Sequence, residues 1–327
     1  MNELDVKLEQ RSDYRDLSEK VSQIKAELAK VVVGQQHVIE LLLTAILADG
    51  HALIEGPPGV AKTLIAKLLS KTIRAGFSRI QFTPDLLPSD VLGTSVFMPG
   101  SGKFEFKRGP VFSNIILIDE INRAPAKTQA ALFEVMEERQ VTVDGVTYKM
   151  DCPFIVLATQ NPVEHEGTYS LPEAQLDRFL FKISITYPTA DEEIRALNLH
   201  HNGIQAHIQE VNPVLDIATL QALRNSIVSQ VHVEPRLMEY MVRITGQTRE
   251  NRFIYLGASP RASIAILNGS KTLAAIRGRD FVTPEDIQTV AYPALRHRII
   301  LTPEKEMEGA DADEIIRFII QKIEVPR

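Results

Sequence analysis

Residues 56–63 read Gly-Pro-Pro-Gly-Val-Ala-Lys-Thr and constrain the fold more than any other segment of the chain. The apolar run 52–54 precedes them and predicts a buried strand, and the helical pattern 64–69 follows. A Gly-rich turn between a strand and a helix presents backbone N–H groups and a helix N-terminus, which together bind phosphate. The segment therefore predicts an α/β fold with a phosphate-binding loop. A Gly/Pro turn that binds no ligand is the alternative.

Several side chains of this loop have distinct expected roles. Lys62 is expected to reach the β- and γ-phosphates of a nucleotide, and the Thr63 hydroxyl to ligate Mg²⁺. Ala61 stands where the usual pattern has Gly, and we expect the loop to tolerate its methyl group because Ala adopts helical φ and ψ. The residues expected to line the nucleotide here are Gly56, Pro57, Pro58, Gly59, Val60, Ala61, Lys62, Thr63 and Leu64.

Strands alternate with helices from the loop to residue 187, which predicts a parallel sheet between helices. The expected strands of the sheet are 52–54, 80–82, 115–118, 154–159 and 179–186. Two β-hairpins are expected as insertions, at 94–106 and at 141–148, the second around an Asp-Gly turn. Phe97, Phe104 and Phe106 of the first hairpin suit either ordinary packing or the gripping of a substrate.

Helical patterns fill the chain beyond residue 188, with 230–234 as the one strand-like candidate. Helix starts are expected at Pro235, at Pro260, at Thr283 and in the acidic stretch 311–314. We therefore expect an α/β nucleotide-binding domain at 1–188 and a small helical domain at 189–327.

Acidic and amide side chains follow the expected strands. Asp119 and Glu120 end the apolar run 115–118, so Asp119 is expected to face the metal and Glu120 to polarise an attacking water as general base. Asn161, with Gln160 as the weaker candidate, is expected to hold that water or contact the γ-phosphate. The alternatives are an acidic pair that caps the next helix and an Asn-Pro turn without a ligand.

Composition narrows the cellular setting. The net charge of −6 and the pI of 5.8 give no global basic field toward nucleic acid or anionic lipid, although a ring can enclose a basic pore. The single Cys152 excludes an internal disulfide framework and a cysteine-rich metal site. With neither a secretory signal nor an apolar run of membrane-spanning length, a cytoplasmic protein is expected.

Motifs along nearly the whole chain resemble those of AAA+ ATPases, and within them the MoxR family. The motifs are the loop with Ala before Lys, Ile118-Asp119-Glu120-Ile121-Asn122-Arg123-Ala124, Ala158-Thr159-Gln160-Asn161-Pro162, Leu171-Pro172-Glu173-Ala174-Gln175-Leu176-Asp177-Arg178-Phe179 and Ser259-Pro260-Arg261-Ala262. The resemblance implies an AAA+ P-loop NTPase core, with a five-stranded sheet, two inserted hairpins and a helical lid.

The resemblance also implies roles for individual residues. Asn161 matches sensor 1, Arg178 the arginine finger offered to a neighbouring subunit, and Arg261 sensor 2, which contacts the γ-phosphate from the lid. Arg123 matches an additional sensor acting across the interface. The segment Val33, Gly34 and Gln35 matches the lining of the adenine pocket.

The function implied is a chaperone-like remodelling ATPase that binds ATP and Mg²⁺ in a homo-hexameric ring. Protein clients and a von Willebrand factor A domain protein in trans are the implied partners, with no nucleic acid and no membrane span. A nucleic-acid motor, the motor subunit of a metal chelatase and a non-hydrolysing nucleotide switch are the alternatives.

Overall fold

The computed structural model describes residues 13–161, 169, 171–201 and 203–326. Five strands form a parallel sheet in the order β2-β5-β8-β1-β9. Their bounds are β1 (His51–Glu55), β2 (Phe77–Gln81), β5 (Ile115–Asp119), β8 (Ile155–Gln160) and β9 (Phe179–Ser184). The predicted α/β class with a five-stranded parallel sheet is confirmed.

Both faces of the sheet are covered, because the apolar side chains alternate between two cores. Ile115 and Leu117 of β5 pack into one cluster, and Ile116 and Ile118 into the other. Every residue of β5 is buried, which is typical of a central parallel strand. The helices around the sheet are α2 (Arg15–Ala29), α3 (Gln36–Leu47), α4 (Lys62–Thr72), α5 (Pro88–Leu92), the 3₁₀ turn η1 (Ile121–Arg123), α6 (Ala126–Glu138) and α7 (Glu173–Leu176).

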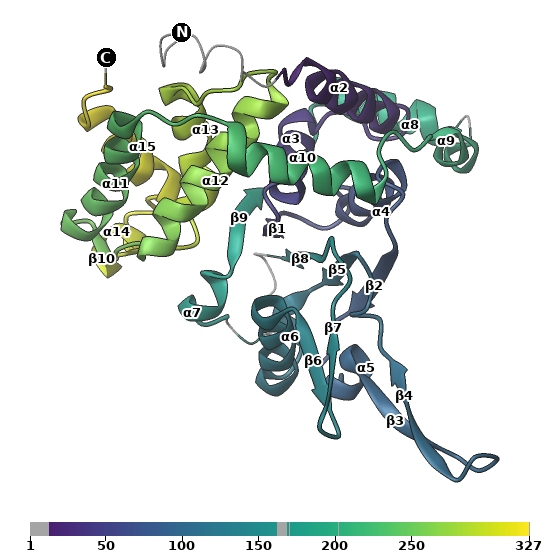
Figure 1. Cartoon of the computed structure of the whole chain (residues 1–327). Coiled ribbons are helices and arrows are strands. Elements are labelled where there is room, and N and C mark those ends of the chain that lie inside the picture. The colour runs from purple at the N-terminus through teal and green to yellow at the C-terminus, as the bar shows by residue number, and fades with distance from the viewer. Residues whose placement is uncertain (1–12, 162–168, 170, 202, 327) are drawn as a thin grey trace, which may run out of the picture.

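Two antiparallel hairpins extend together on the side away from the C-terminal helices (Figure 1). They are β3 (Gly93–Met98) with β4 (Lys103–Arg108), and β6 (Gln140–Val143) with β7 (Val146–Lys149). Phe106 stacks on Tyr148 of the other hairpin, with ring centroids 4.5 Å apart. Phe97 and Phe104 instead pair with each other and remain 51% and 71% exposed. Phe106 therefore packs the two hairpins together, while the other two rings face outward.

The rest of the chain is mainly helical and lies beside the sheet (Figure 1). Its helices are α8 (Ala190–His201), α9 (Ile204–Glu210), α10 (Ile217–Gln230), α11 (Pro235–Glu250), α12 (Pro260–Ile276), α13 (Pro284–Leu295), α14 (Pro303–Met307) and α15 (Ala312–Lys322). The prediction of a strand at 230–234 is wrong, because His232 makes only an isolated bridge, to Phe281.

A short antiparallel ribbon that the sequence did not indicate joins β10 (Ile254–Leu256) to β11 (Ile300–Leu301). With two or three residues each, these strands are too short to give a readable alternation. The boundary at residue 188 stays a prediction.

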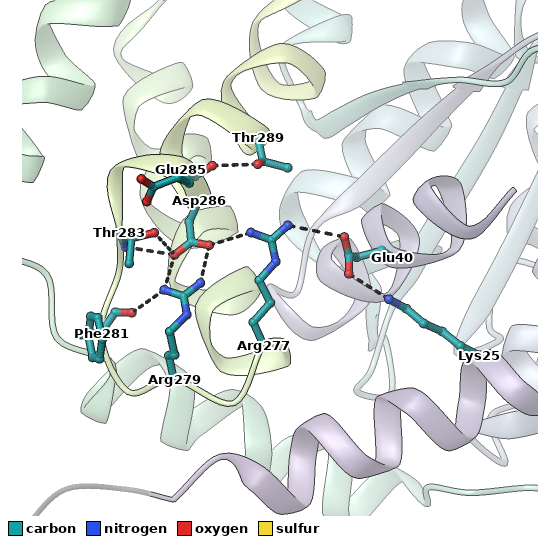
Figure 2. Close-up of polar contacts among 9 residues, drawn as sticks. All are labelled: Lys25, Glu40, Arg277, Arg279, Phe281, Thr283, Glu285, Asp286 and Thr289. Carbon is teal, nitrogen blue, oxygen red and sulfur yellow. Dashed lines mark hydrogen bonds and ion pairs between the residues drawn. The ribbon is translucent and has the colours of Figure 1, made fainter. Parts of the chain in front are cut away.

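A polar network joins the helical region to the N-terminal helices (Figure 2). Asp286 of α13 is fully buried and pairs with Arg277 at 3.0 Å and with Arg279 at 2.7 Å. Arg277 also lies 3.7 Å from Glu40 of α3, which in turn pairs with Lys25 of α2 at 2.8 Å. A buried carboxylate is tolerated only when cations and hydrogen bonds compensate it, so this network fixes α12 and α13 against α2 and α3.

None of the helices within the described ranges combines the length and the apolar character that a membrane crossing requires.

His51 connects the first strand to α6 from a fully buried position. Its Nδ1 accepts a hydrogen bond from the backbone N–H of Val156 at 3.0 Å, so the proton lies on Nε2, which donates to the Met136 carbonyl at 3.3 Å. Burial lowers the pKa of His51 from 6.5 to about 4. The neutral imidazole is therefore part of the folded structure.

His51 should make the fold sensitive to mild acid. Its pKa is depressed in the folded state, so the stabilisation is complete above pH 6.5 and is lost as the pH falls toward 4. From pH 7.5 to pH 5 we expect a loss of about 2 kcal/mol in the free energy of unfolding from this residue. Urea unfolding of the wild type and of His51→Gln at both pH values measures it. The variant should show the smaller loss by that amount, and equal losses would contradict the prediction.

Candidate functional site

The phosphate loop joins the end of β1 to the start of α4. Lys62, the first residue of α4, donates from Nζ to the Gly56 carbonyl at 2.7 Å, so its ammonium lies within the loop. A Cβ on Gly56 would lie 2.6 Å from the Ile185 carbonyl oxygen. Only glycine therefore permits this close approach between the loop and the segment after β9.

Ala61 adopts a left-handed conformation, with φ 61° and ψ 22°, immediately before α4. The expectation that it takes helical φ and ψ is wrong. An L-residue with a Cβ is strained there by roughly 1–2 kcal/mol, which is why the usual pattern has Gly. The loop accepts Ala at that cost.

Asp119 ends β5 and lies opposite the loop. The Thr63 Oγ1 donates to its Oδ2 at 3.4 Å, and the Thr159 Oγ1 donates to its Oδ1 at 3.2 Å. Arg79 of β2 pairs with the same Oδ2 at 2.6 Å. Asp119 is thus buried among two hydroxyls and a guanidinium at the carboxyl end of the sheet.

Glu120 follows with φ 57°, a left-handed conformation that a glutamate rarely adopts. Its backbone N–H donates to Thr159 Oγ1 at 3.0 Å. Its Oε2 accepts from Gln81 Nε2 at 3.0 Å and from Arg123 at 2.9 Å. Strained backbone of this kind is concentrated at functional sites, and here it directs the carboxylate toward β2 and η1.

Asn161 comes directly after β8, whose last residue contacts the phosphate loop. Gln160 pairs in register with Glu55, and its carbonyl accepts a hydrogen bond from the Gly56 N–H at 3.4 Å. Asn161 therefore follows a strand end that contacts the phosphate loop. Pro162, the last residue of its motif, lies outside the described residues.

The segment Val33, Gly34 and Gln35 lies beside the chain that leaves β9. Gln35 Nε2 donates to the Thr186 carbonyl at 3.2 Å, one residue past the Ile185 that contacts Gly56. A Cβ on Gly34 would lie 2.5 Å from the Glu192 carboxylate. The predicted adenine segment and the phosphate loop thus border the same stretch of chain.

Arg178 and Arg261 lie together, at the other edge of the sheet. Arg178 immediately precedes β9, whose first residue Phe179 pairs with His51, the first residue of β1. Arg178 pairs with Glu137 of α6 at 2.6 Å, and Arg261 pairs with the same carboxylate at 3.0 Å. Lys62, Asp119 and Asn161 instead follow the carboxyl ends of their strands. A five-residue strand separates the two edges by about 13 Å.

The predicted metal ligands fit a hard cation. Thr63 and Asp119 offer two converging oxygens, the donor type that Mg²⁺ takes while keeping several waters. In the part of the chain that is described, no three His, Cys, Asp or Glu residues cluster into a protein-only metal cage. An ion here would therefore depend on oxygens of a bound phosphate.

The sequence patterns predicted no role for four residues of this region: Arg79, Gln81, Thr159 and Glu137. Arg79 and Gln81 alternate around Ile80 on β2, so both face the acidic strand end. That alternation was readable, but the adjacency of β2 to β5 was not. Glu137 stands in an acidic run of α6 that is typical of a solvated helix surface.

Comparison with known proteins gives concordant matches. A family model described as ATPase family associated with various cellular activities (AAA) matches residues 51–181, and a model of the AAA lid domain matches 246–319.

Two curated relatives match almost the whole chain. Chaperone MoxR1 of Mycobacterium tuberculosis is 42% identical over 92% of this chain and 81% of its own. The uncharacterized protein YeaC of Bacillus subtilis is 46% identical over 95% of this chain and 96% of its own. The crystal structure of a Cytophaga hutchinsonii protein described as a candidate ATPase superposes with a TM-score of 0.89 at 44% identity, covering 96% of this chain and 97% of that one.

Ala61→Gly should relieve the strain in the loop. Glycine adopts a positive φ freely, and this gain exceeds its greater entropy loss on folding, so we expect a stabilisation of up to about 1 kcal/mol. The control is Ala196→Gly, at an exposed position inside α8, which should destabilise by about 1 kcal/mol. Denaturant midpoints of the two variants measure both effects. Equal losses would contradict the left-handed conformation of Ala61.

Proposed function

The chain belongs to the MoxR family of AAA+ ATPases, and from this premise we propose that it hydrolyses ATP, with Mg²⁺, at sites built between subunits of a homo-hexameric ring. Its function is that of a chaperone-like remodelling ATPase. The observation that carries the proposal is the separation of Arg178 and Arg261 from Lys62, Asp119 and Glu120 by the length of the sheet. Arginines at that edge serve a nucleotide only if it belongs to a neighbouring subunit.

The residues at the carboxyl edge bind and orient the substrate in this proposal. Lys62 exchanges the Gly56 carbonyl for phosphate oxygens, and the N–H groups at the start of α4 hold the same phosphates. Glu120 accepts a proton from the attacking water, and Asn161 orients that water. Thr63 and Asp119 would hold Mg²⁺, which when bound neutralises charge on the phosphates.

The residues at the amino edge complete the neighbouring site. Arg178 and Arg261 neutralise charge that develops on the transferred phosphoryl group. Arg261 then reaches the γ-phosphate from the lid in company with Arg178, on the neighbour's nucleotide. Arg123 pairs with its own Glu120, and its predicted role across the interface stays a prediction.

The domain boundary at residue 188, the protein partners and the cellular location belong to the same proposal. The core 1–188 and the helical domain 189–327 are the two parts of each subunit in this proposal, and the exposed Phe97 and Phe104 contact a protein client. A von Willebrand factor A domain protein acts in trans, in the cytoplasm. The name of the MoxR1 relative, a chaperone, supports a protein client over a nucleic acid.

Arg178→Ala should abolish most of the turnover. An arginine supplied by a neighbour contributes about 10³–10⁵ in rate, so kcat should fall by that order while ATP binding to the subunit is retained. For the wild type, turnover per subunit should also fall on dilution as the ring dissociates. Steady-state phosphate release across a dilution series measures both effects, with Arg243→Ala, an exposed arginine of α11, as the control. Turnover per subunit that is independent of concentration, or unaffected by Arg178→Ala, would refute the shared site.

Glu120→Gln should separate binding from hydrolysis. The amide keeps the shape of the side chain but accepts no proton, so turnover should fall about 10²–10⁴-fold while ATP still binds. Titration with a fluorescent ATP analogue and phosphate release measure the two properties, and Glu239→Gln, at an exposed position of α11, is the control. If Glu120→Gln turned over ATP at the wild-type rate, Glu120 would not be the base. The trapped ring is also suited to the capture of protein clients.

A further inference from the structure

Glu137 occupies a fixed position at the amino edge of the sheet. It lies in the last turn of α6, next to Met136, whose carbonyl accepts the hydrogen bond from buried His51. Its carboxylate is partly exposed. The backbone below the carboxylate is thus anchored, and the carboxylate itself remains accessible.

Each oxygen of this carboxylate holds a different arginine. Oε2 pairs with Arg178 of the core at 2.6 Å, and Oε1 pairs with Arg261, in the first turn of α12, at 3.0 Å. Two guanidiniums this close repel one another, and the carboxylate between them compensates part of that repulsion. Glu137 therefore gathers into one place the two arginines that the proposed function assigns to the neighbouring nucleotide.

Arg178 is incompletely satisfied in this position. Its Nη1 donates to the Phe133 carbonyl and its Nη2 to Glu137. Its Nε is buried without a hydrogen-bond partner among the described residues, and so is the Oε1 of Gln175. A hollow of about 220 Å³ between α6 and α7 is lined by Glu137, Gln175 and Arg178. A buried donor without a partner is unfavourable, so this conformation is easily exchanged for one with better acceptors.

The backbone that carries the two arginines is held firmly. Asp177, the residue before Arg178, accepts from buried Arg298 at 2.6 Å and from the Ser259 hydroxyl at 2.8 Å. Ser259 caps α12 two residues before Arg261. Both arginines thus have fixed Cα positions, and each leaves Glu137 by side-chain rotation alone.

We propose that Glu137 is the positioning residue for both arginines: it holds them on their own subunit until the polyphosphate of a neighbouring nucleotide replaces it as their anionic partner. The inference rests on the proposed function, because it takes Arg178 and Arg261 to act across the interface. Each new interface then breaks the two ion pairs of Glu137. A ring without this carboxylate should therefore assemble more readily in ATP.

The test compares Glu137→Gln with Glu239→Gln, an equal charge change on an exposed glutamate of α11 that pairs with Arg243. Both are made in the Glu120→Gln background, so that assembly in ATP is measured by sedimentation without hydrolysis. We expect Glu137→Gln to lower the protein concentration at half-assembly about three- to tenfold, the scale of two partly exposed ion pairs, and Glu239→Gln to leave it unchanged. An unchanged or raised concentration for Glu137→Gln, or an equal decrease for Glu239→Gln, would overturn the inference.

Removal of the arginines distinguishes this inference from the proposed function. Adding Arg178→Ala and Arg261→Ala should abolish the effect of Glu137→Gln on assembly, because the carboxylate acts only through them. If the effect persists without the arginines, Glu137 acts on assembly by another route and the inference fails. If Arg178→Ala alone leaves wild-type turnover intact, the proposed function fails first. Thermal unfolding of dilute subunits shows whether Glu137→Gln has merely weakened the fold, in which case assembly should become weaker, against the inference.

Discussion

The parallel register of β1 with β8 and β9 is the constraint on which the site depends. It aligns His51 with Phe179 at one edge and Glu55 with Gln160 at the other. The phosphate loop, which follows β1, and Asp119, which ends β5, both lie at the carboxyl edge. Arg178 precedes a strand and is held at the amino edge. One sheet thus carries, at opposite edges, the two groups of residues that the proposed site combines from neighbouring subunits.

Polar side chains at each edge already compensate charges in the single chain. Arg79 pairs with Asp119, and Gln81 and Arg123 bind Glu120, so the buried Asp119 and the half-buried Glu120 both have compensating partners. At the amino edge, Glu137 compensates the positive charges of Arg178 and Arg261. The charged side chains of both edges are therefore compensated within the single chain, and in the proposed site nucleotide binding exchanges these partners for those of the ligand.

Local sequence patterns predicted the helices and strands well, but they did not predict which of these elements lie next to one another. The run 115–118 and the Asp-Gly turn of the second hairpin carry strong short-range signals, and both elements are where the sequence placed them. The conformation of Ala61 was missed because the loop's closure, and not the residue's own preference, imposes a positive φ. The Glu137 contacts were missed because they join α6 to residues about 40 and 124 positions away, a separation that no local pattern records.

Mixing two inactive variants tests the shared site most directly. Arg178→Ala subunits keep Glu120 but lack the finger, and Glu120→Gln subunits keep the finger but lack the base. In mixed rings, an interface that combines Glu120 of one subunit with Arg178 of the next is intact, so ATP hydrolysis should reappear and be greatest near equal proportions. Turnover in the mixture that equals the sum of the two separate variants at every ratio would contradict a site built by two subunits.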